Sequence, residues 1–251
     1  MRPHKSNYWI HPKIEDEQEF VSRLEEIGKT YKAAMQPNSK LNVSSSDEKT
    51  GIQALRHLKV EAMKPGRDER KDPEYKRNGT TTLIASRDVK AGKINAFSLG
   101  KTRKEHDFLE HVKEIVATDP TGEHVIICDQ LNTHKSVSLV EWVAGQIGYT
   151  GDLGVKSVQG ILKSMETRME FLEIKHHRIR FLYTPKHCSW MNQIENWFGV
   201  LQSKVINRGE FYSVCALEDK IKNFIKYYNR CMVKPMNWKS EGEKYRNEFV
   251  N

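Results

Sequence analysis

In the stretch HVIICDQLNTHKS, residues 124–136, an apolar run leads directly into a carboxylate. Its apolar run from Val125 to Cys128 has the length and composition of a buried strand, and the carboxylate of Asp129 follows directly. A carboxylate at the end of a buried strand is costly unless a cation or hydrogen bonds offset its desolvation. We therefore expect Asp129 to lie at the edge of a central sheet and to serve a chemical purpose there.

Alternating and helical patterns on both sides of this strand predict a mixed α/β protein. The expected strands are LNVSSSDE ending at Asp47, a hairpin over 80–100, the run 124–128, and 178–185. The expected helices cover 14–35, 104–120, 136–148, 161–173, 189–206 and 216–230. The segments 59–78, which is densely charged, and 148–160, which is rich in glycine, are expected to be loops. This order suits a mixed sheet with helices on its faces.

The composition favours a polyanionic partner and excludes several classes of protein. Lysine and arginine number 41 against 33 aspartate and glutamate residues, a formal net charge of +8, which favours nucleic acid. The apolar runs are too short for a membrane-spanning helix, and no apolar segment follows the basic N-terminus, so we expect a cytoplasmic protein. The four cysteines form no CxxC pair and are expected to be reduced thiols without a shared role.

Three acidic residues, Asp47, Asp129 and Glu195, stand at the ends of strong elements. In α/β sheets, sites form where strand ends meet helix termini. Three carboxylates brought together need a counter-charge, which hard divalent cations supply. Two such ions about 3.5–4 Å apart would activate a water or a 3′-hydroxyl and stabilise the leaving oxygen of a phosphodiester. The alternative is that these residues are caps or solvated charges, since the chain has 33 acidic residues.

Four stretches resemble the DDE transposases of the IS630 family, bacterial relatives of the Tc1/mariner group. In chain order they are SSSDEKTGIQAL, NGTTTLIA, VIICDQLNTHKS and RFLYTPKHCSWMNQIENWF. The resemblance implies an RNase H-like fold, a mixed five-stranded sheet with helices on both faces. It implies an acidic triad of Asp47, Asp129 and Glu195 that holds two Mg²⁺ or Mn²⁺ ions. The expected activity is cleavage of DNA at transposon ends and transfer of the cut strands into target DNA.

The same resemblance implies partners and a division of the chain. The expected partner is double-stranded DNA, as transposon ends and as a target joined at TA, bound by a homodimer in a bacterial cytoplasm without membrane contact. Residues 1–40 would be a linker and first helix that follow an absent helix-turn-helix region. Residues 41–235 would be the catalytic domain, with an insertion at about 145–178, and 236–251 a C-terminal tail. Because the helix-turn-helix region is absent, a truncated, non-catalytic DNA-binding or regulatory remnant is a second hypothesis. An RNase H-type hydrolase acting on RNA–DNA hybrids is a third.

Further residues near the triad have two interpretations each. Asn132 and His134 would touch the substrate or support the carboxylates, or else cap a turn and pack in the core. Asn192 would share a helical face with Glu195 and orient it, or else cap the first turn. Glu48, beside Asp47, would point to the opposite face of its strand and make a structural contact.

Two basic segments are the expected DNA phosphate contacts, with a solvated face as the alternative. Their residues are Lys76, Arg77, Lys101, Arg103 and Lys104.

Overall fold

The computed structural model of the protein describes residues 16–186, 188–235 and 238. The strands are β1 (Leu41–His57), β2 (Val60–Glu61), β3 (Arg70–Lys71), β4 (Tyr75–Asp88), β5 (Ile94–Gly100), β6 (Glu123–Cys128) and β7 (Ile179–Tyr183). The α-helices are α1 (Glu17–Met35), α2 (Glu105–Ala117), α3 (Val137–Ile147), α4 (Met165–Leu172), α5 (Ile194–Leu201) and α6 (Val214–Tyr227). Short 3-10 or π turns are η1 (Asn132–Lys135), η2 (Ser189–Met191), η3 (Gln202–Ile206) and η4 (Tyr228–Met232).

Five strands form one mixed sheet in the order β5-β4-β1-β6-β7. β4 pairs antiparallel with β5 and β1, whereas β6 pairs parallel with β1 and β7. β1 is therefore the strand at which the antiparallel half of the sheet meets the parallel half. The mixed five-stranded sheet expected from the sequence is confirmed.

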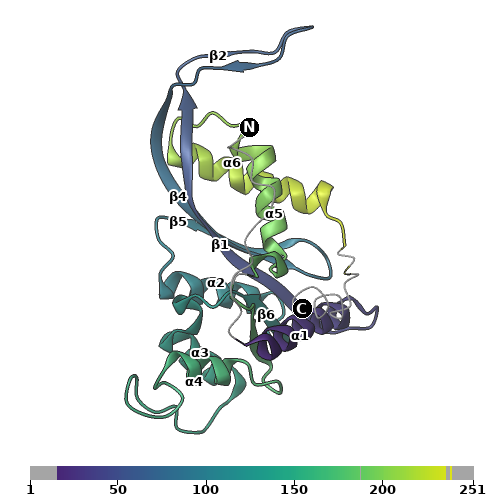
Figure 1. Ribbon diagram of the computed structural model, residues 1–251, viewed down its shortest axis with the longest axis vertical. Coiled ribbons are helices and arrows are strands. Elements are labelled where there is room, and N and C mark those ends of the chain that lie inside the picture. Colours follow the sequence, from purple (N-terminus) through teal and green to yellow (C-terminus); the bar gives the residue numbers. More distant parts are fainter. Residues whose placement is uncertain (1–15, 187, 236–237, 239–251) are drawn as a thin grey trace.

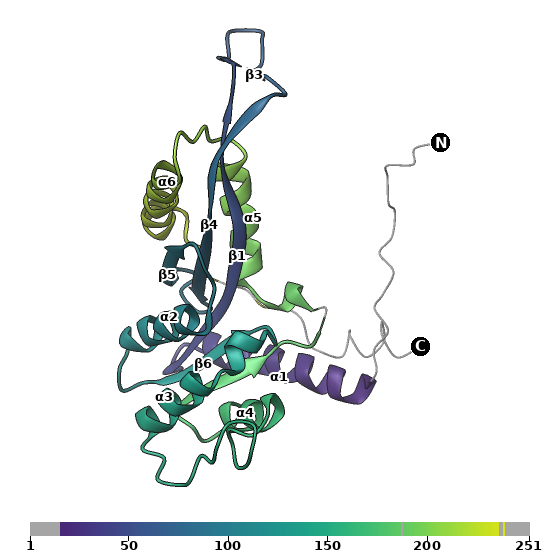
Figure 2. The ribbon, with the colours of Figure 1, turned by 90° about the vertical axis from the view of Figure 1, so that its left-hand side faces the viewer.

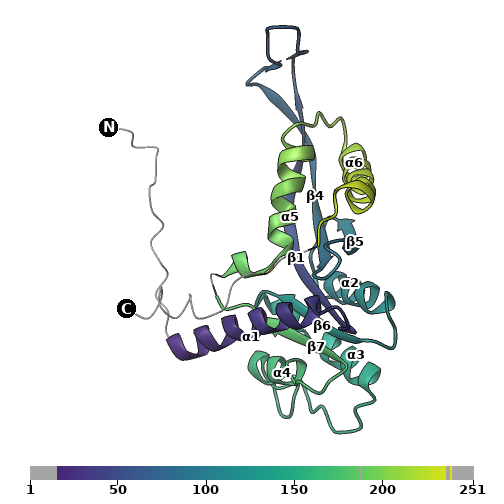
Figure 3. The same cartoon turned by 90° about the vertical axis from the view of Figure 1, so that its right-hand side faces the viewer.

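Helices cover both faces of this sheet (Figure 2, Figure 3). Ile126 and Cys128 of β6 pack in one core cluster with α2, α3 and α4, while Val125 and Ile127 pack in another with α1. α5 and α6 cover the hairpin half, formed by β1, β4 and β5. Each buried aliphatic side chain contributes about 1.5–3 kcal/mol, so the strand that precedes Asp129 is firmly anchored on both faces.

The first strand is longer than predicted. Asp47 was expected at its end, but β1 continues to His57 because its second half pairs with an equally long β4. Ile52 and Ala54 in that half are buried under the α5 and α6 cluster, which stabilises the extension. The charged segment 59–78 contains the two-stranded ribbon of β2 and β3 and the beginning of β4, rather than only a loop. Figure 1 shows β1 and β4 rising together to this ribbon.

The continuous helix expected over 189–206 is interrupted. A 3-10 turn, η2, comes first, and Asn192 then adopts extended backbone angles, φ −81° and ψ 106°. α5 begins only at Ile194 and passes into a π turn, η3, after Leu201. The helical spacing of apolar residues in this segment is real, but the polar side chain of Asn192 is used in tertiary contacts instead of helix capping.

Parts of two expected segments lie outside the described residues. These are residues 1–15 of the linker and most of the tail 236–251, of which only Trp238 is described. Among the described residues, no helix combines the length and apolar character needed to cross a membrane.

Candidate active site

Asp47 and Asp129 occupy equivalent positions on neighbouring parallel strands. The last paired residues of β1 and β6 are Ser45 and Ile127, and each aspartate lies two residues further along its own strand. Side chains two residues apart in a strand share a face. The register therefore brings both carboxylates to the same side of the sheet, at the point where β6 ends and β1 continues.

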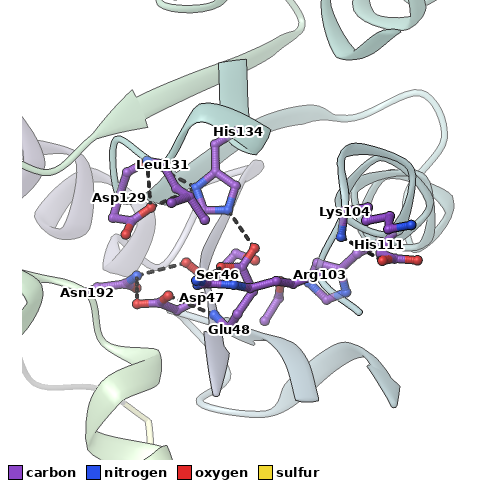
Figure 4. A network of polar contacts seen from close by, with 12 residues as sticks. Ser46, Asp47, Glu48, Arg103, Lys104, His111, Asp129, Leu131, His134 and Asn192 are labelled. Carbon is purple, nitrogen blue, oxygen red and sulfur yellow. Dashed lines mark hydrogen bonds and ion pairs between the residues drawn. The ribbon is translucent and has the colours of Figure 1, made fainter. Parts of the chain in front are cut away.

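The carboxylate of Asp47 is held by two neutral donors. Its Oδ1 accepts the Glu48 backbone N–H at 2.7 Å, and its Oδ2 accepts the side-chain amide of Asn192 at 3.1 Å. Asn192 is fully buried and also donates to the carbonyl of Ser46 at 2.8 Å (Figure 4). The side chain of Asn192 thus holds Asp47, and Asn192 contacts Glu195 through its backbone carbonyl, which accepts the Glu195 N–H at 3.1 Å. The sequence had predicted that the Asn192 side chain orients Glu195.

Glu195 approaches the same face from α5. It is the second residue of this helix and is exposed. The Ser45 hydroxyl accepts the Ile194 backbone N–H at 3.0 Å and donates to Asn192 Oδ1, which ties the start of α5 to β1. The helix terminus therefore has a fixed place beside Asp47.

The pKa of Asp47 is raised from 3.8 to about 7. Burial is the main cause, and the negative charges of Asp129, Glu195 and Glu48 add to it against the hydrogen bond from the Glu48 backbone. A shift in this direction arises when a carboxyl group is buried and other carboxylates lie near it. The charges of Asp129 and Glu195 therefore bear on Asp47 in the fold.

Asp129 has a different environment, dominated by His134. His134 Nδ1 lies 2.9 Å from Asp129 Oδ1, and its Nε2 lies 2.9 Å from Glu48 Oε1 (Figure 4). Burial acts to lower the pKa of His134, but contacts with Cys128, Asp129 and Glu48 raise it well above 6.5. The imidazolium, helped by the Leu131 backbone N–H and the charge of Arg103, lowers the pKa of Asp129 against the effect of burial.

His134 is enclosed by the core on its remaining sides. Its ring centroid lies 4.0 Å from that of Phe108 in α2, and its carbonyl accepts the Tyr183 hydroxyl at 2.8 Å. Its side chain has no exposure, and that of Glu48 only 2 %. Glu48 therefore lies on the face of β1 opposite Asp47, where the alternation of a strand places it.

Asn132 is exposed at the start of η1. The hydrogen bond that closes this turn runs from the His134 backbone N–H to the Leu131 carbonyl at 3.0 Å. Just before the turn, Asp129 Oδ1 accepts the Leu131 N–H at 3.0 Å, so the side-chain contact to the backbone at this point comes from Asp129.

The predicted phosphate contacts fall into two separate places. Lys101, Arg103 and Lys104 are exposed in the loop before α2, and Arg103 Nη1 lies 4.0 Å from Glu48 Oε2. Lys76 instead pairs with Arg56, nine residues along β1 from Asp47, which is roughly 30 Å away at strand spacing. The structure therefore brings Arg103 near Glu48 and Asp129 and leaves Lys76 and Arg77 at the far end of the β1–β4 pair.

Sequence reasoning missed the contacts of Ser45, Glu48 and Tyr183 with the site. Ser45 has a visible signal, because it lies two residues before Asp47 in the run SSSDE and so shares its face. The partners of Glu48 and Tyr183 follow only from pairing between distant segments.

The donor chemistry of this site fits a hard divalent cation. Asp47, Asp129 and Glu195 offer only oxygen ligands, which are the ligands that such cations prefer. Across the described ranges 16–186 and 188–235, no three His, Cys, Asp or Glu side chains already form a group that could hold a metal ion. The acidic side chains are thus gathered on one face and would have to turn toward a common point to share an ion.

Comparisons with known proteins concern the family and the fold of the chain. The sequence matches the family described as DDE superfamily endonuclease over residues 42–218, and the integrase core domain over residues 195–248. No curated protein matches the sequence.

Solved structures with a similar fold come from the Mos1 mariner transposase. The Mos1 paired end complex with Mn has 11 % identity and a TM-score of 0.51, covering 96 % of this chain and 61 % of that one. The Mos1 catalytic domain with Raltegravir and Mn has 9 % identity and a TM-score of 0.50, covering 94 % and 93 %. The corresponding structure with Mg has 10 % identity and a TM-score of 0.50, covering 95 % and 93 %.

At these identities the likeness concerns the fold alone. The chain spans 61 % of the length of the chain in the Mos1 paired end complex. The fold is the RNase H-like fold of the integrase core, as the sequence predicted.

Proposed function

Because this chain belongs to the DDE superfamily endonucleases, we propose that it is the catalytic domain of a DNA transposase of the IS630 type. The activity would be cleavage of DNA strands followed by transfer of their 3′ ends into target DNA. The motifs SSSDEKTG, CDQLNTH and NQIENWF support the IS630 assignment. The observation that carries the proposal is the shared register of Asp47 and Asp129 beside Glu195.

Asp47, Asp129 and Glu195 would hold two Mg²⁺ or Mn²⁺ ions. Bound divalent cations would lower the pKa of the attacking water or 3′-hydroxyl and offset charge on the leaving oxygen. Asp129, whose pKa is lowered beside His134, offers a charged oxygen near neutral pH, whereas Asp47, with a pKa of about 7, is ionised there only in part.

Other residues of the chain would orient the DNA and the acidic side chains. Asn192 keeps Asp47 turned toward the shared face through its hydrogen bond. The exposed cations of the segment 101–104, of which Arg103 lies near Glu48, would contact phosphates on either side of the scissile bond. Arg103 would approach closest, because its guanidinium already lies near Glu48.

The proposed division of the chain follows the same assignment. Residues 41–235 would form the catalytic domain, with an insertion at about 145–178 between the strand before Asp129 and the helix of Glu195. The partner would be double-stranded DNA, carrying transposon ends and a target joined at TA, and the active form a homodimer. One solved relative in fold is named as a paired end complex, which supports testing for a dimer that joins two DNA ends.

Nicking of a supercoiled plasmid with Mn²⁺ tests the chemistry. Wild type should convert the plasmid to open circles, and Asp129→Asn should not. Asp152→Asn is the matched control, because Asp152 is exposed and only accepts the Gly154 N–H at 2.8 Å, which asparagine also does. Equal nicking by wild type and Asp129→Asn would disprove the proposal. DNA binding without metal-dependent nicking would instead identify a non-catalytic remnant.

A further inference from the structure

Glu48 is a buried carboxylate on the face of the sheet opposite Asp47, which is called the rear face below. It is linked to Asp129 of the candidate active site through His134. It follows Asp47 directly on β1, faces the opposite side of the sheet, and has a side chain only 2 % exposed. A carboxylate buried to this degree is strongly destabilising unless it accepts hydrogen bonds or has a charged partner. Its partner is His134, with Arg103 further away at 4.0 Å.

His134 connects Glu48 to Asp129 through both of its ring nitrogens. Nε2 contacts Glu48 Oε1 at 2.9 Å, and Nδ1 lies 2.9 Å from Asp129 Oδ1 and 3.1 Å from the Asp129 carbonyl. An imidazole with an acceptor at each end cannot turn without breaking one contact. Phe108, against its ring, and the Tyr183 hydroxyl, on its carbonyl, further restrict it.

In this arrangement one carboxylate oxygen of Asp129, Oδ1, is used in contacts within the protein, and the other is the one that could bind a cation. Oδ1 receives both the His134 Nδ1 contact and the Leu131 N–H at 3.0 Å. The side chain of Asp129 is nevertheless 45 % exposed, so the core does not enclose it. Asp129 is therefore fixed in one orientation before any cation binds.

We propose that Glu48 and His134 are positioning residues that fix Asp129 from the rear face of the sheet, so that its Oδ2 faces Asp47. The proposal rests on the proposed function, because it takes Asp129 as a cation ligand. β1 then contributes two consecutive carboxylates with different tasks: Asp47 binds the cation directly, and Glu48 acts through His134 without binding it. Ligands held by a second hydrogen-bonding partner in this way typically lose 10–100-fold in metal affinity when that partner is removed, roughly the effect expected here.

The test compares Glu48→Ala with Glu48→Gln. Glutamine keeps an oxygen that accepts the His134 N–H, whereas alanine removes it. Binding of Mn²⁺ is measured by the electron paramagnetic resonance signal of the free ion, and plasmid nicking is measured across Mn²⁺ concentrations. Glu48→Ala should raise the half-saturating Mn²⁺ concentration by about 10–100-fold, and Glu48→Gln should restore most of the affinity.

Ser86→Ala is the matched structural control. Ser86 is also fully buried and contacts a buried histidine, His111, at 2.6 Å, but neither residue touches the acidic side chains. Its loss should lower thermal stability without changing the half-saturating Mn²⁺ concentration. Should Glu48→Ala not fold, Glu48→Met removes the same acceptor while filling its volume, and Glu48→Gln remains decisive by itself.

The outcomes separate this proposal from the proposed function. Wild-type Mn²⁺ affinity in Glu48→Ala or Glu48→Met would overturn the positioning of Asp129. Loss of Mn²⁺ binding in Glu48→Gln as complete as in Asp129→Asn would also overturn it, because Glu48 would then be a ligand itself. If wild type binds Mn²⁺ but does not nick DNA, the proposed function fails while the Mn²⁺ affinities still decide the positioning. If wild type neither binds Mn²⁺ nor nicks DNA, both proposals fail together.

Discussion

Asp47 and Asp129 lie at matching positions on two neighbouring strands, but their surroundings shift the pKa values of the two carboxyl groups in opposite directions. Asp47 is buried and receives hydrogen bonds only from neutral amide groups, and its pKa rises to about 7. Asp129 is half exposed and contacts the imidazolium of His134, and its pKa falls below the usual value. The site is therefore asymmetric, because one carboxylate has a cation supplied by the fold and the other does not.

This difference explains how the fold tolerates three gathered carboxylates. The rear face of the sheet neutralises Asp129 and Glu48 through one buried histidine. The front face, with Asp47 and Glu195, keeps an uncompensated negative charge. A divalent cation would bind on the front face, where the electrostatic gain is largest.

The largest expected effect is the loss of nicking activity, and it should be similar for the two aspartates despite their different surroundings. Asp47→Asn and Asp129→Asn should each reduce Mn²⁺-dependent nicking by at least about 10³-fold, because each removes a ligand oxygen that supplies several kcal/mol of transition-state stabilisation. Initial nicking rates measure it, with Asp152→Asn as the control. Substantial nicking by only one of the two variants would mean that the two aspartates do not share the ions.

Removing His134 should lower the stability of the protein, besides releasing Asp129. His134→Ala leaves Glu48 buried without its partner, which we expect to cost about 3–5 kcal/mol of unfolding free energy. The pKa of His134 is raised in the folded state, so its stabilisation is fully present below pH 6.5 and is lost as the pH rises through the raised value. Urea unfolding at pH 6 and at higher pH measures both effects. If the loss of unfolding free energy in His134→Ala increased with pH, His134 would not be protonated in the folded protein.

Asp47→Asn should stabilise the metal-free protein at alkaline pH. The pKa of Asp47 is raised from 3.8 to about 7, so between these values the folded state holds a proton that the unfolded chain has released. The contribution of Asp47 to stability therefore falls as the pH rises through this window. At 1.36 kcal/mol per pKa unit the gain at pH 8 is at most roughly 4 kcal/mol, less the weakened hydrogen bonds.

The difference between Asp47→Asn and wild type should vanish near pH 4, and urea unfolding at the two pH values measures it. Adding Mg²⁺ at pH 8 should stabilise wild type and not the variant. Equal stability of the two proteins at pH 8 without metal would show that Asp47 is not under electrostatic strain.

A smaller effect is expected on the support of Asp47. Asn192→Ala removes the amide that holds Asp47 Oδ2, and nicking should fall about 10–100-fold. Its pH dependence should also move to higher pH, because Asp47 loses a donor that favours the ionised form. Asn207→Ala is the control, since Asn207 is exposed and accepts only from Gln202 Nε2 at 2.6 Å. An unchanged pH profile of nicking in Asn192→Ala would mean that Asn192 does not influence the ionisation of Asp47.

The smallest effect distinguishes the two basic segments. Arg103→Ala should weaken DNA binding and reduce the slope of log affinity against log salt by about 1, since it removes one phosphate contact beside the site. It should also slow nicking of bound DNA, whereas Arg77→Ala on the distant hairpin should leave that rate unchanged. Fluorescence anisotropy at several salt concentrations and single-turnover nicking measure the two quantities. If Arg103→Ala and Arg77→Ala changed the nicking rate of bound DNA equally, the position of Arg103 nearer the acidic side chains would have no effect on cleavage.

The sequence predicted the strand before Asp129, the hairpin and the helices after it, and it singled out three acidic residues that stay a prediction. These features follow from local periodicity or from short motifs, as in HVIIC, whose alternate side chains fill two different core clusters. The helix expected over 189–206 shows where such patterns stop. The apolar spacing was correct, but it gave no sign that Asn192 would leave the helix to bind Asp47.

The contacts among the residues of the candidate site depend on the tertiary structure. Asn192 and Asp47 are 145 residues apart in the chain, and His134 and Glu48 are 86 apart. The register of β1 against β6, with Ser45 opposite Ile127, places Asp47 and Asp129 on one face and Glu48 on the other. No local pattern specifies such a register, because it is set by how the two faces of the whole sheet bury their apolar side chains.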